Sequence, residues 1–298
     1  MNATSPWLLG LDLGGTRLKA LCLTPDGVEI DRATASSGGG DWKQSVKQCV
    51  DSLLEKHGQP ADIGVAAPGL PSLDERCIAH MPGKLPGLEG LVWQEFLGFS
   101  KPIRVLNDAH AALLGEVWLG AAKSMRDVIL LTLGTGVGGA FLSNGRLFRG
   151  HTGRAGHFGH ISIHAEGPLG IFNTPGSLED AVGNHSLGAR SGGRFHSTAD
   201  LVAAVKSGDA DAAEIWRKSI RDLAAGVTSL INSFDPEVVV IGGGIAEAGD
   251  DLFIPLAAEL DRVEWRPDGI RVPILRATLG DWAGACGAAV HSIETTNP

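Results

Sequence analysis

The stretch WLLGLDLGGTRLKALCL (residues 7–23) determines the fold that the sequence predicts, because a related stretch occurs later in the chain. In it, Gly14 and Gly15 separate two short apolar segments, a pattern typical of a hairpin turn between two strands. The related stretch is VILLTLGTGVGGAFL (residues 128–142), where Gly134-Thr135-Gly136 takes the place of the first turn. The chain is therefore predicted to contain two hairpins of the same kind, each opening one half of the molecule.

After each hairpin, helix-like and strand-like patterns alternate. Apolar residues recur at helical spacing in WKQSVKQCVDSLLEK (42–56), and IGVAA (63–67) is a short apolar segment that stops at Pro68-Gly69. The order strand, strand, helix, strand, helix is predicted twice, which indicates two related α/β halves. Residues 150–195 are rich in Gly and His with weak periodicity, so they are predicted to be loops around a site. The other predicted strands are 103–107, 146–148, 237–241 and 271–276, and the other predicted helices are 91–98, 109–121, 198–206, 211–233, 251–261 and 282–292.

The composition is that of a globular protein of about two domains. The chain has 298 residues, 43% of them hydrophobic, and its formal charge of −9 disfavours a nucleic-acid groove, which needs a basic face. No apolar stretch reaches the ~20 residues of a membrane helix, and Asp12 interrupts the apolar N-terminal segment, so no membrane partner and no secretory signal are expected. The four cysteines are far apart and form no C-x-x-C pair. These features predict a reduced, cytoplasmic protein.

Both glycine turns have the chemistry that a phosphate group needs. In DLGGT (12–16), glycines expose backbone N–H groups without a Cβ, and Thr16 adds a hydroxyl. A tight turn without a ligand is the alternative for either turn alone. The second turn also fits G-x-G-x-x-G through Gly139, but that dinucleotide fingerprint requires a helix directly after the glycines. A strand and an Asn144-Gly145 hairpin turn are predicted there instead, which argues against an NAD-binding oxidoreductase.

A third glycine turn, Gly242-Gly243-Gly244, follows a buried apolar segment and precedes a helix-like segment. Its flat surface is compatible with a bound adenine and equally with a closely packed helix.

Taken in order, these motifs resemble those of the ROK family (repressors, open reading frames and sugar kinases) of the actin/hexokinase-like superfamily. No helix-turn-helix pattern precedes Trp7, so the resemblance is to the kinase branch. The segments that carry it span nearly the whole chain: GLDLGGTRLKA (10–20), GVAAPG (64–69), LNDAHAALLGE (106–116), LTLGTGVGG (131–139), AGHFGH (155–160), FDPEVVVIGGG (234–244) and GDWAGACGAA (280–289).

The resemblance implies an α/β fold of two actin/hexokinase-like (ribonuclease H-like) lobes. Each lobe is expected to be a mixed β-sheet with flanking helices, with a cleft between the lobes. We expect the N-terminal lobe at residues 1–118 and the C-terminal lobe at 119–283. A C-terminal helix at about 284–298 is expected to pack back on the first lobe. Dimers are common among family members, but no clear interface stripe in this sequence predicts a homodimer.

The resemblance also implies a function, the ATP- and Mg²⁺-dependent phosphorylation of a hexose or hexose derivative at a primary hydroxyl. Asp108 occupies the position of the general base, and phosphoryl transfer needs one carboxylate to accept the proton of the attacking hydroxyl. Taken alone, Asp108 is more typical of a helix N-cap, and only the surrounding motifs favour the general base. The implied sugar-binding residues are Asn107, His157, His160 and Glu179. The implied nucleotide site has Asp12 near the magnesium, Gly14, Gly15, Thr16, Gly134, Thr135 and Gly136 at the phosphates, and Gly242, Gly243 and Gly244 beside the adenosine.

The sequence departs from the family pattern at two sugar-site positions. The family usually has G-E-x-G-H where this chain has Gly156-His157-Phe158-Gly159-His160. A carboxylate only accepts hydrogen bonds, whereas a neutral imidazole donates one and accepts one, so His157 changes the sugar contact. Lys84 replaces an Asn of the family in a loosely aligned loop. If it points inward it suggests an acidic or modified sugar, and otherwise it is a solvated side chain.

The zinc motif of the family is also altered. Many members continue with G-P-x-C-x-C-G-x-x-G-C-x-E, whereas residues 167–179 here are GPLGIFNTPGSLE. Gly170, Phe172 and Ser177 fill the three cysteine positions, and none is a plausible zinc ligand. We therefore expect no structural zinc. A new metal site at His157, His160 and His164 is the less favoured alternative.

A non-catalytic, sugar-sensing regulatory protein without a DNA-binding domain is the main competing function. The altered His157 position and the lost cysteines suggest it. It is disfavoured because both phosphate turns and Asp108 are intact, and a sensor needs neither.

Overall fold

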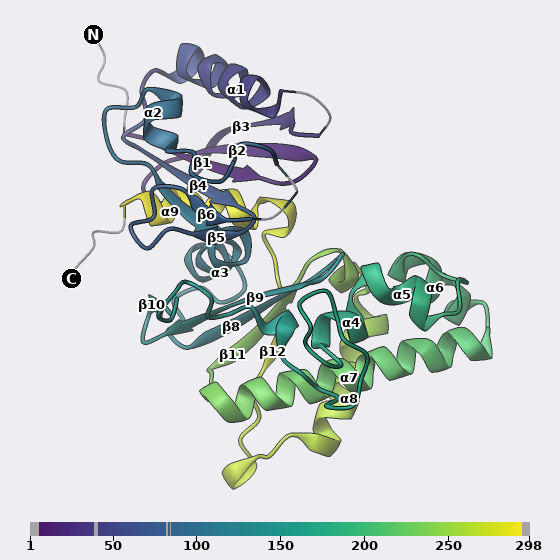
Figure 1. Cartoon of the computed structure of the whole chain (residues 1–298). Coiled ribbons are helices and arrows are strands. Elements are labelled where there is room, and N and C mark those ends of the chain that lie inside the picture. Colours follow the sequence, from purple (N-terminus) through teal and green to yellow (C-terminus); the bar gives the residue numbers. More distant parts are fainter. Residues whose placement is uncertain (1–5, 39–40, 82, 84, 294–298) are drawn as a thin grey trace. The chain divides into compact units, whose positions relative to one another are not determined.

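The computed structural model describes residues 6–38, 41–81, 83 and 85–293 and divides into two compact units (Figure 1). Unit 1 is formed by Met1–Ser124, Arg149–Arg154 and Leu279–Pro298, and unit 2 by Met125–Phe148 and Ala155–Thr278. The chain thus returns to unit 1 twice, once for a short segment and once for its last helix.

Unit 1 is built on a five-stranded mixed sheet in the order β3-β2-β1-β4-β7. Strand β1 is antiparallel to β2 and parallel to β4, so the glycine turn lies on the central hairpin. Alternate residues of β1 face opposite sides: Leu9 packs into a core with Trp42 of α1, and Leu8 into one with Ala285 of α9. The elements are β1 (Leu8–Leu13), β2 (Arg17–Leu23), β3 (Glu29–Ser36), α1 (Trp42–His57), β4 (Asp62–Ala67), β5 (Leu70–Pro71), β6 (Ile78–His80), α2 (Trp93–Leu97), β7 (Arg104–Asn107), α3 (Asp108–Trp118) and α9 (Ala283–Ile293).

The last helix, α9, packs unusually closely on the sheet and on α3. A Cβ at Gly10 of β1 would lie 1.9 Å from the carbonyl oxygen of Ala285, and one at Gly64 of β4 would lie 1.9 Å from that of Ala288. The approach is just as close at Gly287, where a Cβ would meet the backbone of α3. Glycine is therefore required at these positions by the backbone of a neighbouring element.

Unit 2 repeats the sheet of unit 1. Its strand order is β10-β9-β8-β11-β12, with β8 antiparallel to β9 and parallel to β11. Each strand corresponds to the unit 1 strand at the same place in its sheet, and β8 and β9 flank the second glycine turn. The elements are β8 (Val128–Leu133), β9 (Val137–Ser143), β10 (Arg146–Leu147), α4 (Leu178–Val182), α5 (Asn184–Arg190), α6 (Thr198–Lys206), α7 (Ala210–Phe234), β11 (Val238–Gly242), α8 (Asp250–Val263) and β12 (Ile274–Arg276).

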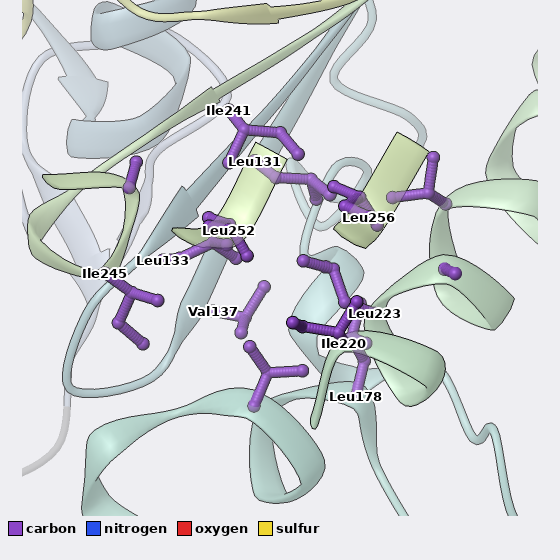
Figure 2. Close-up of a cluster of buried hydrophobic side chains, with 14 of the residues drawn as sticks. Leu131, Leu133, Val137, Leu178, Ile220, Leu223, Ile241, Ile245, Leu252 and Leu256 are labelled. Atoms are coloured by element: carbon purple, nitrogen blue, oxygen red, sulfur yellow. The ribbon is translucent and has the colours of Figure 1, made fainter. Parts of the chain in front are cut away.

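The core of unit 2 lies between this sheet and the long helices. Figure 2 shows Leu131 and Leu133 of β8 beside side chains from α4, α7 and α8. Val137, the first residue of β9, is buried in the same cluster, so the glycine turn before it is anchored on both sides. The other labelled members are Leu178, Ile220, Leu223, Ile241, Ile245, Leu252 and Leu256.

The structure confirms the predicted duplication and most of the predicted elements, and it corrects two expectations. Strand β3 was not predicted, because Glu29–Ser36 lies at the sheet edge and is exposed or half-exposed throughout, so it lacks an apolar pattern. The region 150–195 is not loop alone, since it contains the short helices α4 and α5. Within the described parts of the chain, no helix is both long and apolar enough to cross a membrane.

Candidate functional site

The first glycine turn, in unit 1, is held from one side. The Ser37 hydroxyl donates to the carbonyl oxygen of Gly14 at 2.6 Å, and the Ser37 N–H donates to that of Thr16 at 3.0 Å. In a trans peptide the C=O of one residue and the N–H of the next point in opposite directions. The Gly15 N–H is therefore directed away from Ser37, and a Cβ at Gly15 would meet nothing within 4 Å.

Asp12 lies at the end of β1, just before this turn. Its carboxylate is 3.6 Å from the Lys19 ammonium, and it lies against Gly284 in the first turn of α9, where a Cβ would be 2.8 Å from its carboxyl carbon. Burial raises the pKa of Asp12 to about 6, with Lys19 opposing the shift and the charge of Asp108 adding to it. A buried carboxylate of this kind is stabilised by an added cation, so Asp12 fits a role beside Mg²⁺.

Asp108 is the first residue of α3, and its neighbour Asn107 caps the helix. The Asn107 side-chain oxygen accepts from the N–H groups of Ala109 at 3.0 Å and His110 at 3.4 Å, and its amide donates to the Gly69 carbonyl at 3.1 Å. The sequence alone suggests Asp108 as the N-cap of α3, but in the structure Asn107 is the N-cap. The Asp108 residue is exposed, and its Oδ1 accepts from the Ala109 N–H at 2.8 Å.

The second glycine turn, in unit 2, is also held from one side. The Asn184 N–H donates to the Gly134 carbonyl at 3.0 Å, and the His185 N–H donates to the Thr135 carbonyl at 2.9 Å. By the same peptide geometry, the N–H groups of Thr135 and Gly136 are directed away from this segment. Each unit therefore presents a glycine turn with carbonyls occupied on one side and amides directed away from it, that of Gly15 in unit 1 and those of Thr135 and Gly136 in unit 2. The N–H groups of Gly14 and Gly134 donate within the turns, to the carbonyls of Arg17 at 3.0 Å and Gly136 at 2.9 Å.

Glu179 of α4 reaches the second turn. Its Oε2 accepts from the Val137 N–H at 3.1 Å, and a Cβ at Gly136 would lie 2.1 Å from that oxygen. Its Oε1 lies 3.9 Å from His160 Nδ1. Unit 2 thus brings Glu179, His160 and the second glycine turn together.

The rings of His157 and Phe172 flank the His160 ring, and both residues stand where the family pattern has a different residue. The His157 ring stacks on it with centroids 6.1 Å apart, and the Phe172 ring meets it edge-on at 4.5 Å. The His157 ring therefore lies beside that of His160. Lys84 lies outside the described residues.

The third turn lies directly beside the second. Gly243 has φ +87°, and a Cβ there would be 2.4 Å from the Leu133 carbonyl oxygen, so only glycine fits. Gly244 lines a pocket of about 220 Å³ whose walls include Val202, Ile245 and Ala248. The pocket is apolar in part and has charged residues at Lys206, Glu247 and Asp251. Its size and lining fit a flat heterocyclic base.

The three positions that replace the zinc cysteines have other contacts. A Cβ at Gly170 would meet Asp180 Oδ2 at 2.2 Å, and the Ser177 hydroxyl donates to the same oxygen at 2.6 Å. Phe172 contacts His160 as described, and His164 pairs with Asp222 at 3.0 Å. Among the residues that the structure describes, no three His, Cys, Asp or Glu side chains gather in a way that could hold a metal ion.

Purified protein is predicted to contain no stoichiometric zinc, because no cysteine occupies the three motif positions and the loop is closed by its own backbone hydrogen bonds, from the Gly176 N–H to the Pro168 carbonyl at 2.9 Å and from the Gly170 N–H to the Thr174 carbonyl at 3.1 Å. Elemental analysis after purification without added metal, and thermal unfolding with and without a chelator, test this. We expect an unchanged unfolding temperature. One zinc per chain, or a clear loss of stability on chelation, would contradict it.

The structure distributes the sequence-predicted residues between the two units. Asp12, the first turn, Asn107 and Asp108 lie in unit 1; the second and third turns, His157, His160 and Glu179 lie in unit 2. The sequence did not reveal Ser37, Lys19 or His185, each of which contacts one of these residues. No spacing rule connects these residues to the turns. The only weak signal is for Lys19, because the β1–β2 hairpin pairs it with Asp12.

The comparisons with known proteins agree with this architecture. A glucokinase from Halalkalibacterium halodurans is 32% identical over 94% of this chain and 93% of its own length. The solved structure of a ROK hexokinase from Thermus thermophilus has a TM-score of 0.84 and 28% identity, covering 96% of this chain and 97% of that one. A ROK family glucokinase from Streptomyces griseus, solved with glucose and AMPPNP, has a TM-score of 0.78 and 26% identity, covering 96% and 99%.

Two α/β units with the same strand order, each with a glycine turn on its central hairpin, define an actin/hexokinase-like fold. Within that class the chain belongs to the ROK family, whose model matches residues 8–294.

Proposed function

We propose that this sugar kinase transfers the γ-phosphoryl group of ATP to a primary hydroxyl of a hexose or hexose derivative, with Asp108 as the general base. The observation that supports the proposal is that Asn107 and Asp108 have different roles at the start of α3. Asn107 makes the capping bonds, so the exposed Asp108 carboxylate is not needed to begin the helix. Asp108 directly follows the carboxyl end of the edge strand β7, and ligands of α/β folds bind at the carboxyl ends of strands, so its carboxylate fits the role of a base.

The nucleotide would be held by the three glycine turns. Gly14, Gly15 and Thr16, and Gly134, Thr135 and Gly136, would line the phosphates. The N–H groups of Gly15, Thr135 and Gly136 would be the donors, because those of Gly14 and Gly134 already donate within their turns. Gly242, Gly243 and Gly244 would border the adenosine, with the base in the pocket at Gly244. The open space above Gly15, Gly134 and Gly244, where a Cβ would meet nothing within 4 Å, supports this assignment.

The reaction needs one proton transfer and one phosphoryl transfer. The sugar hydroxyl gives its proton to Asp108 while its oxygen forms a bond to the γ-phosphorus. The bond from that phosphorus to the β,γ-bridging oxygen breaks, and ADP leaves with that oxygen. Mg²⁺, held by Asp12 and the phosphates, would offset the negative charge of the phosphate oxygens.

The sugar would be oriented by Glu179, His160, His157 and Asn107. Glu179 accepts hydrogen bonds from hydroxyls, and its anchoring to the Val137 N–H fixes its position. The paired rings of His157 and His160 are the feature by which this sugar site differs most from the family pattern, so the preferred sugar need not be glucose.

A regulatory, sugar-sensing role is the competing proposal, and it has less support because the phosphate turns and Asp108 are intact.

ATP as the donor suits a cytoplasmic location, which the free state of all four cysteines also favours.

Coupled ADP release across a panel of hexoses, amino sugars and N-acetyl sugars tests the activity, with polyphosphate replacing ATP in a parallel series. We expect ATP-dependent turnover of at least one sugar, and a product phosphorylated at the primary hydroxyl by NMR. A protein that binds a sugar but releases no ADP with any member of the panel would contradict the kinase and favour the sensor.

A further inference from the structure

His185, at the start of α5, contacts a hydrogen-bond acceptor with each of its ring nitrogens. Nδ1 lies 2.9 Å from the carbonyl oxygen of Thr135, and Nε2 lies 2.9 Å from Oδ1 of Asp180. The same Thr135 carbonyl also accepts from the His185 backbone N–H. Gly183 leaves room for this arrangement, because a Cβ there would lie 2.7 Å from the Thr135 oxygen and 2.9 Å from His185 Nδ1.

A neutral imidazole cannot satisfy both contacts. It carries one N–H and one bare nitrogen, and the bare nitrogen would face an oxygen lone pair at hydrogen-bond distance. A carbonyl oxygen never donates, and Asp180 already accepts, through Oδ2, from the Ser177 hydroxyl at 2.6 Å. The contacts are satisfied together when both ring nitrogens of His185 carry protons.

The charges around His185 favour the same state. Burial alone would lower its pKa, but the hydrogen bonds to Asp180 and Thr135, with the charge of Glu179, outweigh burial and raise the pKa above its ordinary value. Burial would likewise raise the pKa of Asp180, but the Ser177 and His185 hydrogen bonds keep it below the usual range. Of the other titratable side chains nearby, His160 contributes to the lowered pKa of Asp180, and Arg190 of α5 donates to the Gly183 carbonyl.

We propose that His185 is a doubly protonated positioning residue for the second phosphate turn, bonded to the Thr135 carbonyl so that the following amide faces the nucleotide phosphates. The effect on nucleotide binding rests on the proposed function, whereas the protonation state does not. The imidazolium acts in two ways. It fixes the Thr135–Gly136 peptide, and it offsets the charge of Asp180, which together with Glu179 would otherwise repel a triphosphate.

The arrangement makes nucleotide affinity depend on pH in a defined direction. A base with a raised pKa keeps its proton below that value and loses it as the pH rises through it. Deprotonation of His185 removes one of its two ring hydrogen bonds, and the Asp180 carboxylate loses the opposite charge of the imidazolium. Affinity for the triphosphate should therefore be highest at the lower pH and fall as His185 loses its proton.

The protonation state can be read without any activity. Nitrogen NMR of the ring in the free full-length protein, with the His185 signals assigned by their loss in His185→Gln, should show two protonated ring nitrogens at pH 7. If that variant folds poorly, the His185 signals are assigned from Asp180→Asn, which should lower the pKa of His185 and leave the histidines of unit 1 unchanged. One protonated and one bare nitrogen at pH 7 would overturn the proposal.

The positioning role is read from direct binding of AMPPNP with Mg²⁺ by calorimetry. In wild type the Kd should rise about tenfold as the pH passes through the titration seen by NMR, the loss expected for one charge-assisted hydrogen bond. In His185→Gln this dependence should disappear, with weaker binding at the lower pH. The matched control is His57→Gln, which removes a histidine bonded to Asp31 at 2.8 Å in unit 1 and should keep the wild-type dependence.

The outcomes separate the two proposals. An imidazolium seen by NMR together with a Kd that does not follow its titration would overturn the positioning role. Failure of wild type to bind AMPPNP at any pH would instead count against the proposed ATP site, while the NMR result would still decide the protonation state of His185.

Discussion

Asp108→Asn is expected to lower kcat by about 10²- to 10⁴-fold, the usual contribution of a general base. The replacement keeps the shape of the side chain but cannot accept the proton of the sugar hydroxyl at neutral pH. Because Asn107 caps α3, the helix should be unaffected, and the KM for the sugar should change little. Steady-state kinetics with the best sugar from the panel, together with thermal unfolding, measure both effects.

The matched control is Asp41→Asn. Asp41 is the N-cap of α1, where its carboxylate accepts from the N–H of Lys43 at 3.1 Å, and Asn is an equally good cap. This variant removes a carboxylate at a helix start in the same unit and should keep wild-type kcat. If Asp108→Asn retained full kcat, or if both variants lost activity alike, the assignment of Asp108 as base would be wrong.

The elements that could be predicted from the sequence are those that bury an apolar pattern. Strand β8 and helix α7 lie in a core, β8 as a continuous apolar segment of six residues and α7 with a helical apolar pattern over 25 residues. Strand β3 was missed because at the edge of the sheet it needs few apolar residues. The sequence also could not show that the segment Arg149–Arg154 belongs to unit 1. There Arg149 forms an ion pair with Glu75, and the two residues are 74 positions apart in the sequence.

Some residues of the candidate site could likewise be located from the sequence, and others could not. The glycine turns and Asp108 could be located because they are continuous stretches of sequence with a recognisable composition. The side chains that hold those turns could not be located. Ser37 bonds to a glycine 23 residues earlier, and His185 to a threonine 50 residues earlier. Serine and histidine are common residue types with many uses, so only the folded structure connects them to a turn.

Gly136→Ala is expected to lower kcat/KM for the sugar by about 10²-fold, the cost of a displacement of roughly 1 Å in a positioning group. The new Cβ would lie 2.1 Å from Oε2 of Glu179, so the carboxylate must move and would lose its bond from the Val137 N–H. The KM values for sugar and for ATP, measured separately, show which substrate is affected. Thermal unfolding shows whether the unit stays folded.

Gly134→Ala is the informative companion, because the two glycines belong to one turn but differ in what their Cβ atoms would meet. A Cβ at Gly134 meets nothing within 4 Å, so Glu179 should stay in place and the KM for the sugar should be kept. The added methyl group would instead occupy space assigned to the phosphates and raise the KM for ATP. Since Gly136→Ala acts through Glu179, combining it with Glu179→Gln should cost little more than Glu179→Gln alone. Additive losses, or an unchanged KM for the sugar in Gly136→Ala, would show that the second turn and the sugar site are not linked through this carboxylate.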